Sequence, residues 1–161
     1  MKKTNKDMGA VTKRAAIPDG SGILDGFGDV NFWDSYCVAA RTDQSPAEIM
    51  RKIMTMPRWV AALFRLRNAI VGVFGLKTGS ADAAFPVISQ TENEVITGLP
   101  DKHLNFRASL VKDTTAGTIS LTTVVHFNNI WGRIYFLPVK PFHKIILRTL
   151  LHRYSRITHA R

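Results

Sequence analysis

The sequence has little cysteine, which limits the chemistry open to it. Cys37 is the single cysteine among 161 residues, so no disulfide can form within one chain. A disulfide framework and a cysteine-rich metal site are therefore excluded. The lysine-rich residues 1–7 are not followed by an apolar stretch. We therefore expect no secretory signal and a cytoplasmic location.

The sequence also lacks an uninterrupted apolar run long enough to cross a bilayer. The most apolar stretch, residues 59–76, is interrupted by Arg65, Arg67 and Asn68. A charged side chain at mid-bilayer costs about 3 kcal/mol, so two arginines disfavour a membrane-spanning helix. The hydrophobic share of 45% and the charged share of 21% are instead typical of soluble globular proteins. A chain of this size buries roughly 70% of its unfolded surface, enough for one domain with a core.

Acidic residues are absent from the last part of the chain. Residues 1–113 hold 15 Lys and Arg against 12 Asp and Glu, which gives +3 of the net charge of +10. Residues 114–161 hold 7 Lys and Arg and no acid, which gives the remaining +7. Such a one-signed block favours an anionic partner, namely a phospholipid head group, a nucleic acid, an acidic protein or a charged ligand.

Several motifs of familiar functions are missing as well. The sequence has no Gly-x-Ser-x-Gly nucleophile elbow and no Gly-x-Gly-x-x-Gly element after a strand. It has no zinc finger, helix-turn-helix or RNA-binding aromatic pair, so a nucleic-acid partner is disfavoured. Asp101, His103 and His126 do not follow a known ligand spacing. We therefore expect no cofactor and no metal.

A capping box marks the start of the first predicted helix. In residues 45–48, Ser-Pro-Ala-Glu, the proline takes the first helical position, and the serine and glutamate side chains can accept from each other's backbone amides. The pattern predicts a helix to about residue 55, after a strand over residues 30–40. A second helix is predicted from residue 57 to 75, because apolar residues recur there at spacings of three and four.

The middle of the chain is predicted to form antiparallel strands, and its end a long helix. The predicted strands are residues 85–91, 94–97, 103–111 and 118–127, with turns at 92–93, 98–101 and 112–117. From residue 130 to about 157 the apolar period becomes helical, and Pro138 and Pro141 within it predict a kink or two helical pieces. Residues 1–28 are predicted to be an irregular lead-in, because they are rich in Asp-Gly and Ser-Gly turns.

This order predicts an α+β domain in which the last helix covers the apolar face of a twisted antiparallel sheet. We expect one domain over residues 29–157, followed by a short tail over residues 158–161.

Three stretches carry a resemblance to a known family: residues 57–71, residues 97–107, and Gly132-Arg133-Ile134-Tyr135 with Pro141-Phe142-His143-Lys144. Over about residues 28–155 the chain resembles a bacterial domain family of unknown function, found alone or fused to NAD(P)-binding short-chain-dehydrogenase-like proteins. The order of elements is similar to the helix-grip fold of the START and birch-pollen-allergen superfamily, also called SRPBCC-like. The resemblance implies a curved sheet wrapped around the C-terminal helix, with a cavity between them.

Candidate pocket residues come from the helices and from the polar sides of two strands. They are Trp59, Arg67, His103, Arg107, His126, Trp131 and Tyr135. His103 and Arg107 would anchor a polar or acidic group, the aromatic residues would form the walls, and Arg67 would lie near an entrance. Purely structural roles for these residues remain open. In that interpretation the polar strand side is a solvated outer face, the aromatic residues pack in the core, and the basic residues lie on the solvent-exposed side of a helix.

These observations favour a small-molecule-binding module that holds an apolar or amphipathic ligand between the sheet and the last helix. An alternative is a cyclase- or dehydratase-like enzyme on the same fold, with His103 or His126 as general acid or base. A third is a basic surface that binds an anionic membrane or an acidic protein. We expect a binding protein rather than an enzyme, and assign no catalytic residue.

Overall fold

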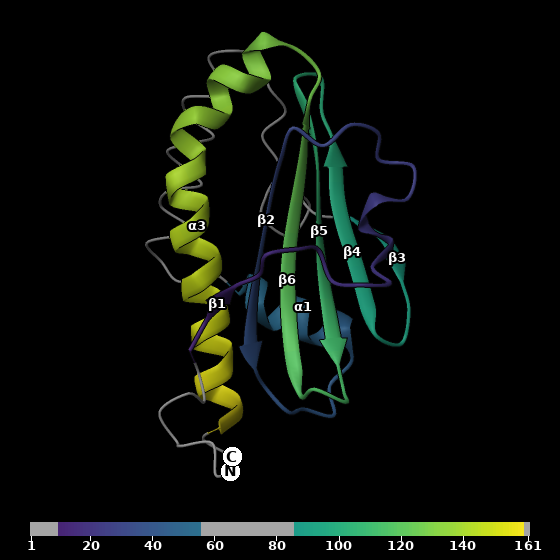
Figure 1. Cartoon of the computed structure of the whole chain (residues 1–161), viewed down its shortest axis with the longest axis vertical. Helices are drawn as coiled ribbons and strands as arrows, with labels where there is room; N and C mark the ends of the chain where they lie inside the picture. The colour runs from purple at the N-terminus through teal and green to yellow at the C-terminus, as the bar shows by residue number, and fades with distance from the viewer. Residues whose placement is uncertain (1–9, 56–85, 160–161) are drawn as a thin grey trace.

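The computed structural model describes residues 10–55 and 86–159 (Figure 1). Within these ranges, six strands form one antiparallel sheet in the order β1-β2-β6-β5-β4-β3. The strands are β1 (Thr12–Lys13), β2 (Phe32–Ala39), β3 (Val87–Gln90), β4 (Glu94–Pro100), β5 (Leu104–Asp113) and β6 (Thr118–Phe127). The helices are η1 (Gly22–Leu24), α1 (Pro46–Met54) and α3 (Ile130–His159). The predicted α+β class is confirmed.

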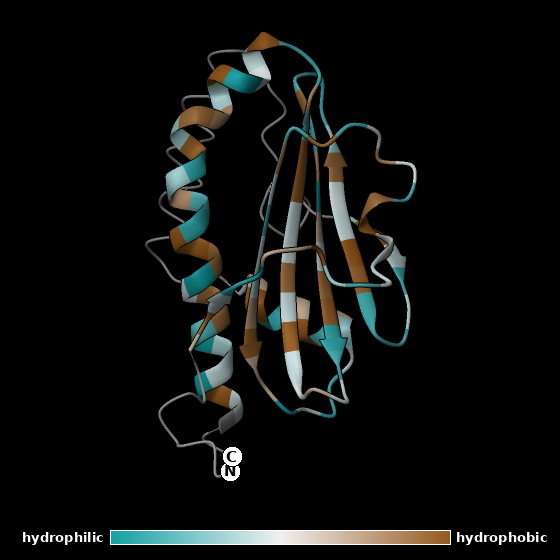
Figure 2. Cartoon of the chain, in the orientation of Figure 1, coloured by the Kyte–Doolittle hydropathy of each residue, from teal (hydrophilic) through white to brown (hydrophobic). Residues whose placement is uncertain are grey.

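The pairing of β2 with β6 joins distant parts of the chain. Eight residues of β2 pair antiparallel with β6, and Tyr36 lies opposite Leu121. The remaining neighbours, β1 with β2, β6 with β5, β5 with β4 and β4 with β3, are consecutive in the chain. Apolar and polar residues alternate along β5 and β6 (Figure 2). One side of the sheet is therefore more apolar than the other.

The inner face of the sheet is the side that packs against α1 and α3. Both helices contribute to one buried core with this face, including Ile49 of α1 and Leu151 of α3. Three rows of paired residues cross the inner face. The upper row is Phe32, Val125, Phe106 and Leu99; the middle row is Asp34, Thr123, Ala108 and Thr97; the lower row is Tyr36, Leu121, Leu110 and Val95. Only the middle row consists of short or polar side chains.

The capping box of α1 forms as predicted. The Ser45 hydroxyl accepts from the Glu48 amide at 3.3 Å, and the Ser45 amide donates to Oε2 of Glu48 at 2.9 Å. Pro46 takes the first helical position. Below the cap, Ile49, Met50 and Ile53 are buried against the sheet. The predicted second helix, residues 57–75, lies outside the described residues, so the helix pair stays a prediction.

The C-terminal helix α3 is continuous over 30 residues and curves along the inner face (Figure 1). Pro138 and Pro141 lie on its exposed side, where each removes one helical amide donor. The prolines therefore accompany a bend and not a break into two pieces. At its start, a Cβ on Gly132 would lie 2.1 Å from the His103 carbonyl oxygen, so only glycine allows this close approach. None of the described helices is long and apolar enough to span a membrane.

The lead-in crosses the outer face of the sheet (Figure 1). Its described part, residues 10–28, is irregular as predicted except at β1 and η1. Ile23 is fully buried, and Glu94 of β4 accepts from the Ser21 hydroxyl at 2.5 Å and from the Gly22 amide at 2.9 Å. The Ser109 hydroxyl also donates to Glu94. This segment is therefore part of the fold and covers the strands that it crosses.

One predicted turn is misplaced. Residues 98–101 were expected to form a turn, but β4 continues to Pro100 and pairs with β5 as far as Asn105. Position 98 within the strand requires glycine, because a Cβ there would lie only 2.6 Å from the Phe106 carbonyl oxygen. Pro100 ends the strand, where its missing amide donor is tolerated. The turn itself begins at Asp101, whose amide donates back to the carbonyl of Leu104, the first residue of β5.

Candidate functional site

The middle row of the inner face contains a buried carboxylate beneath α3. Asp34 is 1% exposed, although it lies on a strand whose other inner-face residues are Phe32, Tyr36 and Val38. Its paired neighbour Thr123 is also buried. A buried carboxylate has a large desolvation cost unless partners compensate it. The partners of Asp34 therefore determine what this site can do.

His143 of α3 is the one side chain that pairs with Asp34 among the described residues. Its Nδ1 lies 3.3 Å from Oδ2 of Asp34, and its side chain is 20% exposed. The other oxygen, Oδ1, is buried and has no hydrogen-bond partner within the described part of the chain. When Asp34 is ionised its carboxylate only accepts, so Nδ1 carries the proton in this pair. In the neutral form of the ring, Nε2 is then free to accept a proton.

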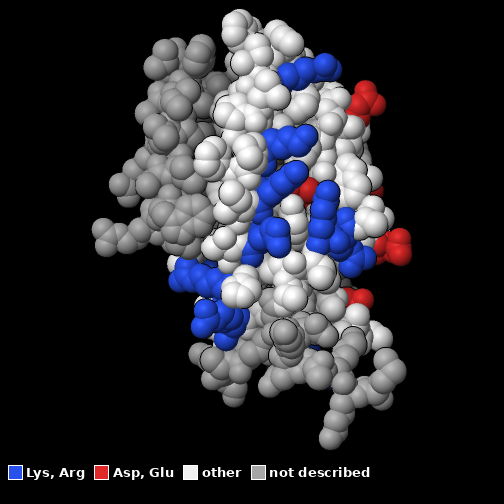
Figure 3. All heavy atoms as spheres, turned by 60° about the vertical axis from the view of Figure 1, so that its left-hand side comes forward, with Lys and Arg blue, Asp and Glu red and all other residues white. Residues whose placement is uncertain are grey.

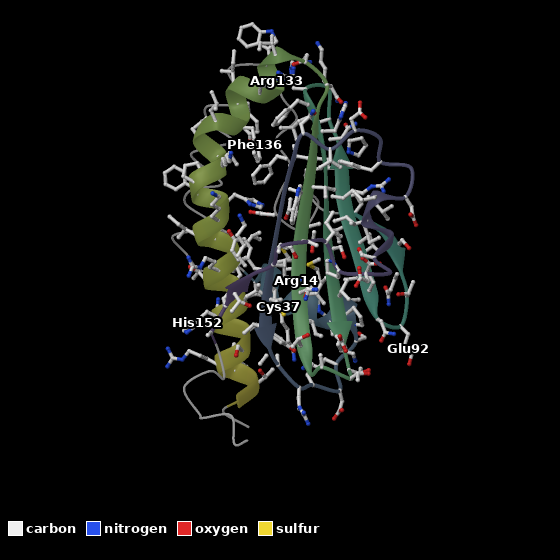
Figure 4. All side chains as sticks on the ribbon, in the orientation of Figure 1. Arg14, Cys37, Glu92, Arg133, Phe136 and His152 are labelled. Atoms are coloured by element: carbon white, nitrogen blue, oxygen red, sulfur yellow. The ribbon has the colours of Figure 1, made fainter. Side chains whose placement is uncertain are left out.

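Aromatic rings surround the pair on the side of the upper row. Phe32 meets the His143 ring edge-on at a centroid distance of 6.3 Å, and it contacts Phe136 of α3 at 4.8 Å. Phe136, which extends from α3 toward the sheet in Figure 4, also contacts Phe127 at 5.4 Å. The Nζ atom of Lys140 lies 5.4 Å from the centre of the Phe32 ring. The polar pair thus adjoins an apolar, aromatic wall.

Tyr36 adds a third titratable group, one step down the inner face of β2. Burial raises the pKa of the Tyr36 hydroxyl, and the Asp34 charge raises it further, while Arg148 lowers it. The phenol therefore keeps its proton at neutral pH. His143, Asp34 and Tyr36 together bring an imidazole, a carboxylate and a protonated phenol to this face.

The predicted pocket residues do not gather at one place in the described structure. His103 precedes β5, and its Nδ1 lies 3.1 Å from Oδ1 of Asn129, which also accepts from the Gly132 amide at the start of α3. Arg107 and His126 are on the outer face. Arg107 donates to the carbonyls of residues 23 and 25, and His126 contacts the carbonyl of residue 29 at 2.7 Å. All three tie loops to the sheet.

The remaining predicted residues lie on α3 or outside the described ranges. Trp131 is more than half exposed, so it faces solvent at the start of α3. Tyr135 is partly buried one turn further on. Trp59 and Arg67 fall outside the described residues. The polar strand side that carries Asn105 and Arg107 faces the lead-in, an arrangement that neither the pocket interpretation nor the solvated-face interpretation included.

Sequence reasoning missed both members of the Asp34–His143 pair. The available signal was the phase of β2, because Phe32, Asp34, Tyr36 and Val38 alternate onto one side and Asp34 is the only charged residue among them. His143 gave a weaker signal, since a histidine beside two helix prolines is readily interpreted as part of a kink.

Other parts of the described surface are weaker candidates for a functional site. No group of three or more His, Cys, Asp or Glu residues suited to a metal ion occurs within residues 10–55 and 86–159. An open hollow of about 590 Å³ lies near the start of α1, lined mainly by polar residues such as Asp43, Glu92 and Lys112. The Nζ atom of Lys112 is already bonded to the Gln44 carbonyl at 2.9 Å. The hollow includes none of the predicted site residues.

Comparison with known proteins gives a family and no activity. No curated protein matches the chain, and no solved structure matches it. One family model matches residues 27–150, from just before β2 to the second half of α3. The match therefore includes both Asp34 and His143. The chain belongs to this family, which is described as "Protein of unknown function (DUF2867)".

Proposed function

We propose that the protein binds a small apolar or amphipathic molecule at the inner face of the sheet, with Asp34 and His143 as its polar anchor. The observation that carries the proposal is the buried Oδ1 of Asp34, which has no partner among the described residues. Leaving a buried acceptor unpaired costs about 1–3 kcal/mol, and more when the group is charged. A ligand hydroxyl or amine that donates to Oδ1 would recover this cost.

The surroundings of the pair support an amphipathic ligand. Phe32, Phe127 and Phe136 form apolar surface next to the anchor, and the middle row carries short side chains. Apolar walls with a few convergent polar groups are the usual composition of a small-molecule site. The proposal keeps the ligand between the sheet and α3, as the family resemblance implied, but moves its anchor from His103 and Arg107 to Asp34 and His143.

The proposal includes the finer fold, a START-like helix grip. Two features support it: β2 lies beside β6, the last strand, and the final helix runs along the face that α1 also covers. In such a fold, the space between sheet and helix is the natural position for a ligand. Fold likeness alone gives no activity, so the function depends on the Asp34 site.

A second candidate is an enzyme that moves protons, of the cyclase or dehydratase kind. The Asp34–His143 geometry favours it, because a carboxylate that fixes the Nδ1–H tautomer leaves Nε2 to take a proton from a substrate carbon or hydroxyl. His143 is better suited to this role than His103 or His126, because it lies at the inner face, whereas His126 is on the outer face and His103 precedes β5. The proton removed is returned to the product or leaves with water, so no redox partner is needed.

Native mass spectrometry of the purified protein tests the binding proposal. We expect a bound small molecule in the wild type, which denaturing extraction then identifies. Asp34→Asn should lose it, because the amide presents only one acceptor atom and no charge. Asp29→Asn is the matched control, since that aspartate is exposed and lies outside the inner face.

The two candidate functions differ in what His143→Gln does to the extracted molecule. A binder should hold it more weakly, whereas an enzyme should bind it and no longer convert it on prolonged incubation. His152→Gln is the control because His152 is an exposed histidine on the same helix (Figure 4). If Asp34→Asn retains the molecule as well as the wild type does, the anchor is wrong.

A further inference from the structure

The first half of α3 exposes a stripe of large apolar side chains. Each member of the stripe has between 49% and 70% of its surface exposed. The members recur at helical spacing along the side that faces away from the sheet: Ile130, Trp131, Ile134, Leu137, Phe142 and Ile145. We call these residues the α3 stripe. Exposed apolar patches of this kind mark interaction sites, because burying them in the core would be the ordinary outcome.

Basic residues flank and extend the α3 stripe. Arg133 and Lys144 lie beside it and are exposed, and Arg148 and Arg156 continue the outward side beyond Ile145. Lys and Arg side chains form a column along this part of the molecule (Figure 3). Helix α3 contains no acidic residue, and within the described chain none of its Lys or Arg side chains forms an ion pair. The positive charge is therefore open to an external anion.

The sheet holds the α3 stripe in place. Gly132 lies directly against the His103 carbonyl, and Phe136 and Leu147 are buried on the opposite side of the helix. The outward side is consequently held as a fixed helical ridge that faces away from the sheet. A ridge with apolar residues at its centre and cations beside it has the composition of a helix that lies in a membrane interface.

We propose that α3 docks the protein onto an anionic phospholipid surface, with the α3 stripe inserted at the level of the head groups and the flanking cations on lipid phosphates. Trp131 at the end of the stripe suits this position, because indole rings are enriched at the membrane–water interface. The docking leaves the inner-face site beneath the same helix, on the side toward the sheet. It does not depend on the proposed ligand binding.

Other occupants fit the ridge less well. A second copy of the chain would bring two cationic helices together, which their charges oppose. A nucleic acid would contact the cations but would leave the apolar centre of the ridge exposed to water. An anionic bilayer satisfies both the charge and the apolar surface.

Vesicle flotation measures the charge contribution. We expect the full chain to bind vesicles of equal parts phosphatidylglycerol and phosphatidylcholine, and to dissociate at high salt. Neutralising Arg133, Lys144 and Arg148 to Gln should lower the affinity about a hundredfold, at roughly fivefold per cation. The control, Arg51→Gln with Lys52→Gln and Lys102→Gln, removes the same charge from exposed sites outside α3. An equal loss in the control would overturn the proposal.

The apolar contribution separates a membrane from any other polyanion. Leu137→Ser with Ile145→Ser changes two exposed positions, so the fold should be retained, which the melting temperature verifies. This pair should weaken binding to the vesicles at least tenfold and leave binding to heparin or duplex DNA unchanged. Equal binding of the pair and the wild type to vesicles would contradict insertion, and tighter wild-type binding to DNA than to vesicles would assign the ridge to nucleic acid instead.

Discussion

Two buried carboxylates on opposite faces of the sheet show how differently a single residue type is used. Glu94 accepts hydrogen bonds from Ser21, Gly22 and Ser109, so both of its oxygens have partners. Among the described residues, Asp34 has one partner, His143, and its other oxygen has none. A buried charge with a full set of donors stabilises the fold, whereas one with a missing donor opposes it. Their stability contributions should therefore have opposite signs.

Urea unfolding of two amide variants tests this contrast. Glu94→Gln should lower the free energy of unfolding by about 1.5–3 kcal/mol, because charge-assisted hydrogen bonds are lost. Asp34→Asn should leave it unchanged or raise it, because the variant removes the desolvation cost of a charge that lacks a donor. A large loss of stability in Asp34→Asn would make Asp34 a structural residue like Glu94.

At the scale of the element, local signals predicted α1 and β6 well and β4 poorly. The capping box requires only residues 45–48, and strict alternation gives the bounds of β6. The extent of β4 depends on its pairing with β5, which residues 98–101 do not reveal because glycine and proline are typical of turns. Elements fixed by their own sequence are predictable, and those fixed by a neighbour are not.

The α1 cap gives a stability prediction with a pH dependence. Ser45→Ala removes the acceptor of the Glu48 amide and should cost about 1 kcal/mol in urea unfolding. The hydrogen bond from the Ser45 amide lowers the pKa of Glu48 below its ordinary value of 4.5, and the Ser45 side chain lowers it further. The contribution of the Glu48 carboxylate to the free energy of unfolding is therefore present above pH 4.5 and is lost as the pH falls through the pKa of Glu48 in the folded protein.

Glu48→Gln isolates the pH-dependent part. At neutral pH this variant should be less stable than the wild type, and the difference should shrink in acid, where the wild-type carboxylate is protonated. A difference that is constant over the same pH range would show that Glu48 acts through its size and not its charge.

For the molecule as a whole, the alternation of apolar and polar residues assigned the strand residues to two faces of the sheet. It did not predict which segments pack on each face. The apolar set of β5 was correctly grouped, while the covering of the other side by the lead-in depends on contacts such as Arg107 with the carbonyls of residues 23 and 25. Those contacts join residues more than eighty positions apart, beyond any local pattern. The site at Asp34 was missed for the same reason, since its partner lies on α3.

Removal of residues 1–28 tests whether the lead-in belongs to the folded unit. Sequence patterns place the domain boundary near residue 29, but the truncation removes fully buried Ile23 and two donors to Glu94. Loss of the Ile23 burial alone is worth about 1.5–3 kcal/mol. We expect a clear fall in the melting temperature, whereas an unchanged value would return the boundary to residue 29.

The pairing of β2 with β6 also has a consequence for how the protein is made. When β2 leaves the ribosome, its long partner β6 has not been synthesised, because residue 39 pairs with residue 118. Until then, the β2 edge and the ring of Phe32 are open to other chains. Pairing of the β2 edge requires β6, and covering of the Phe32 ring requires α3. A nascent chain that stalls before residue 118 is therefore the form most in need of a chaperone.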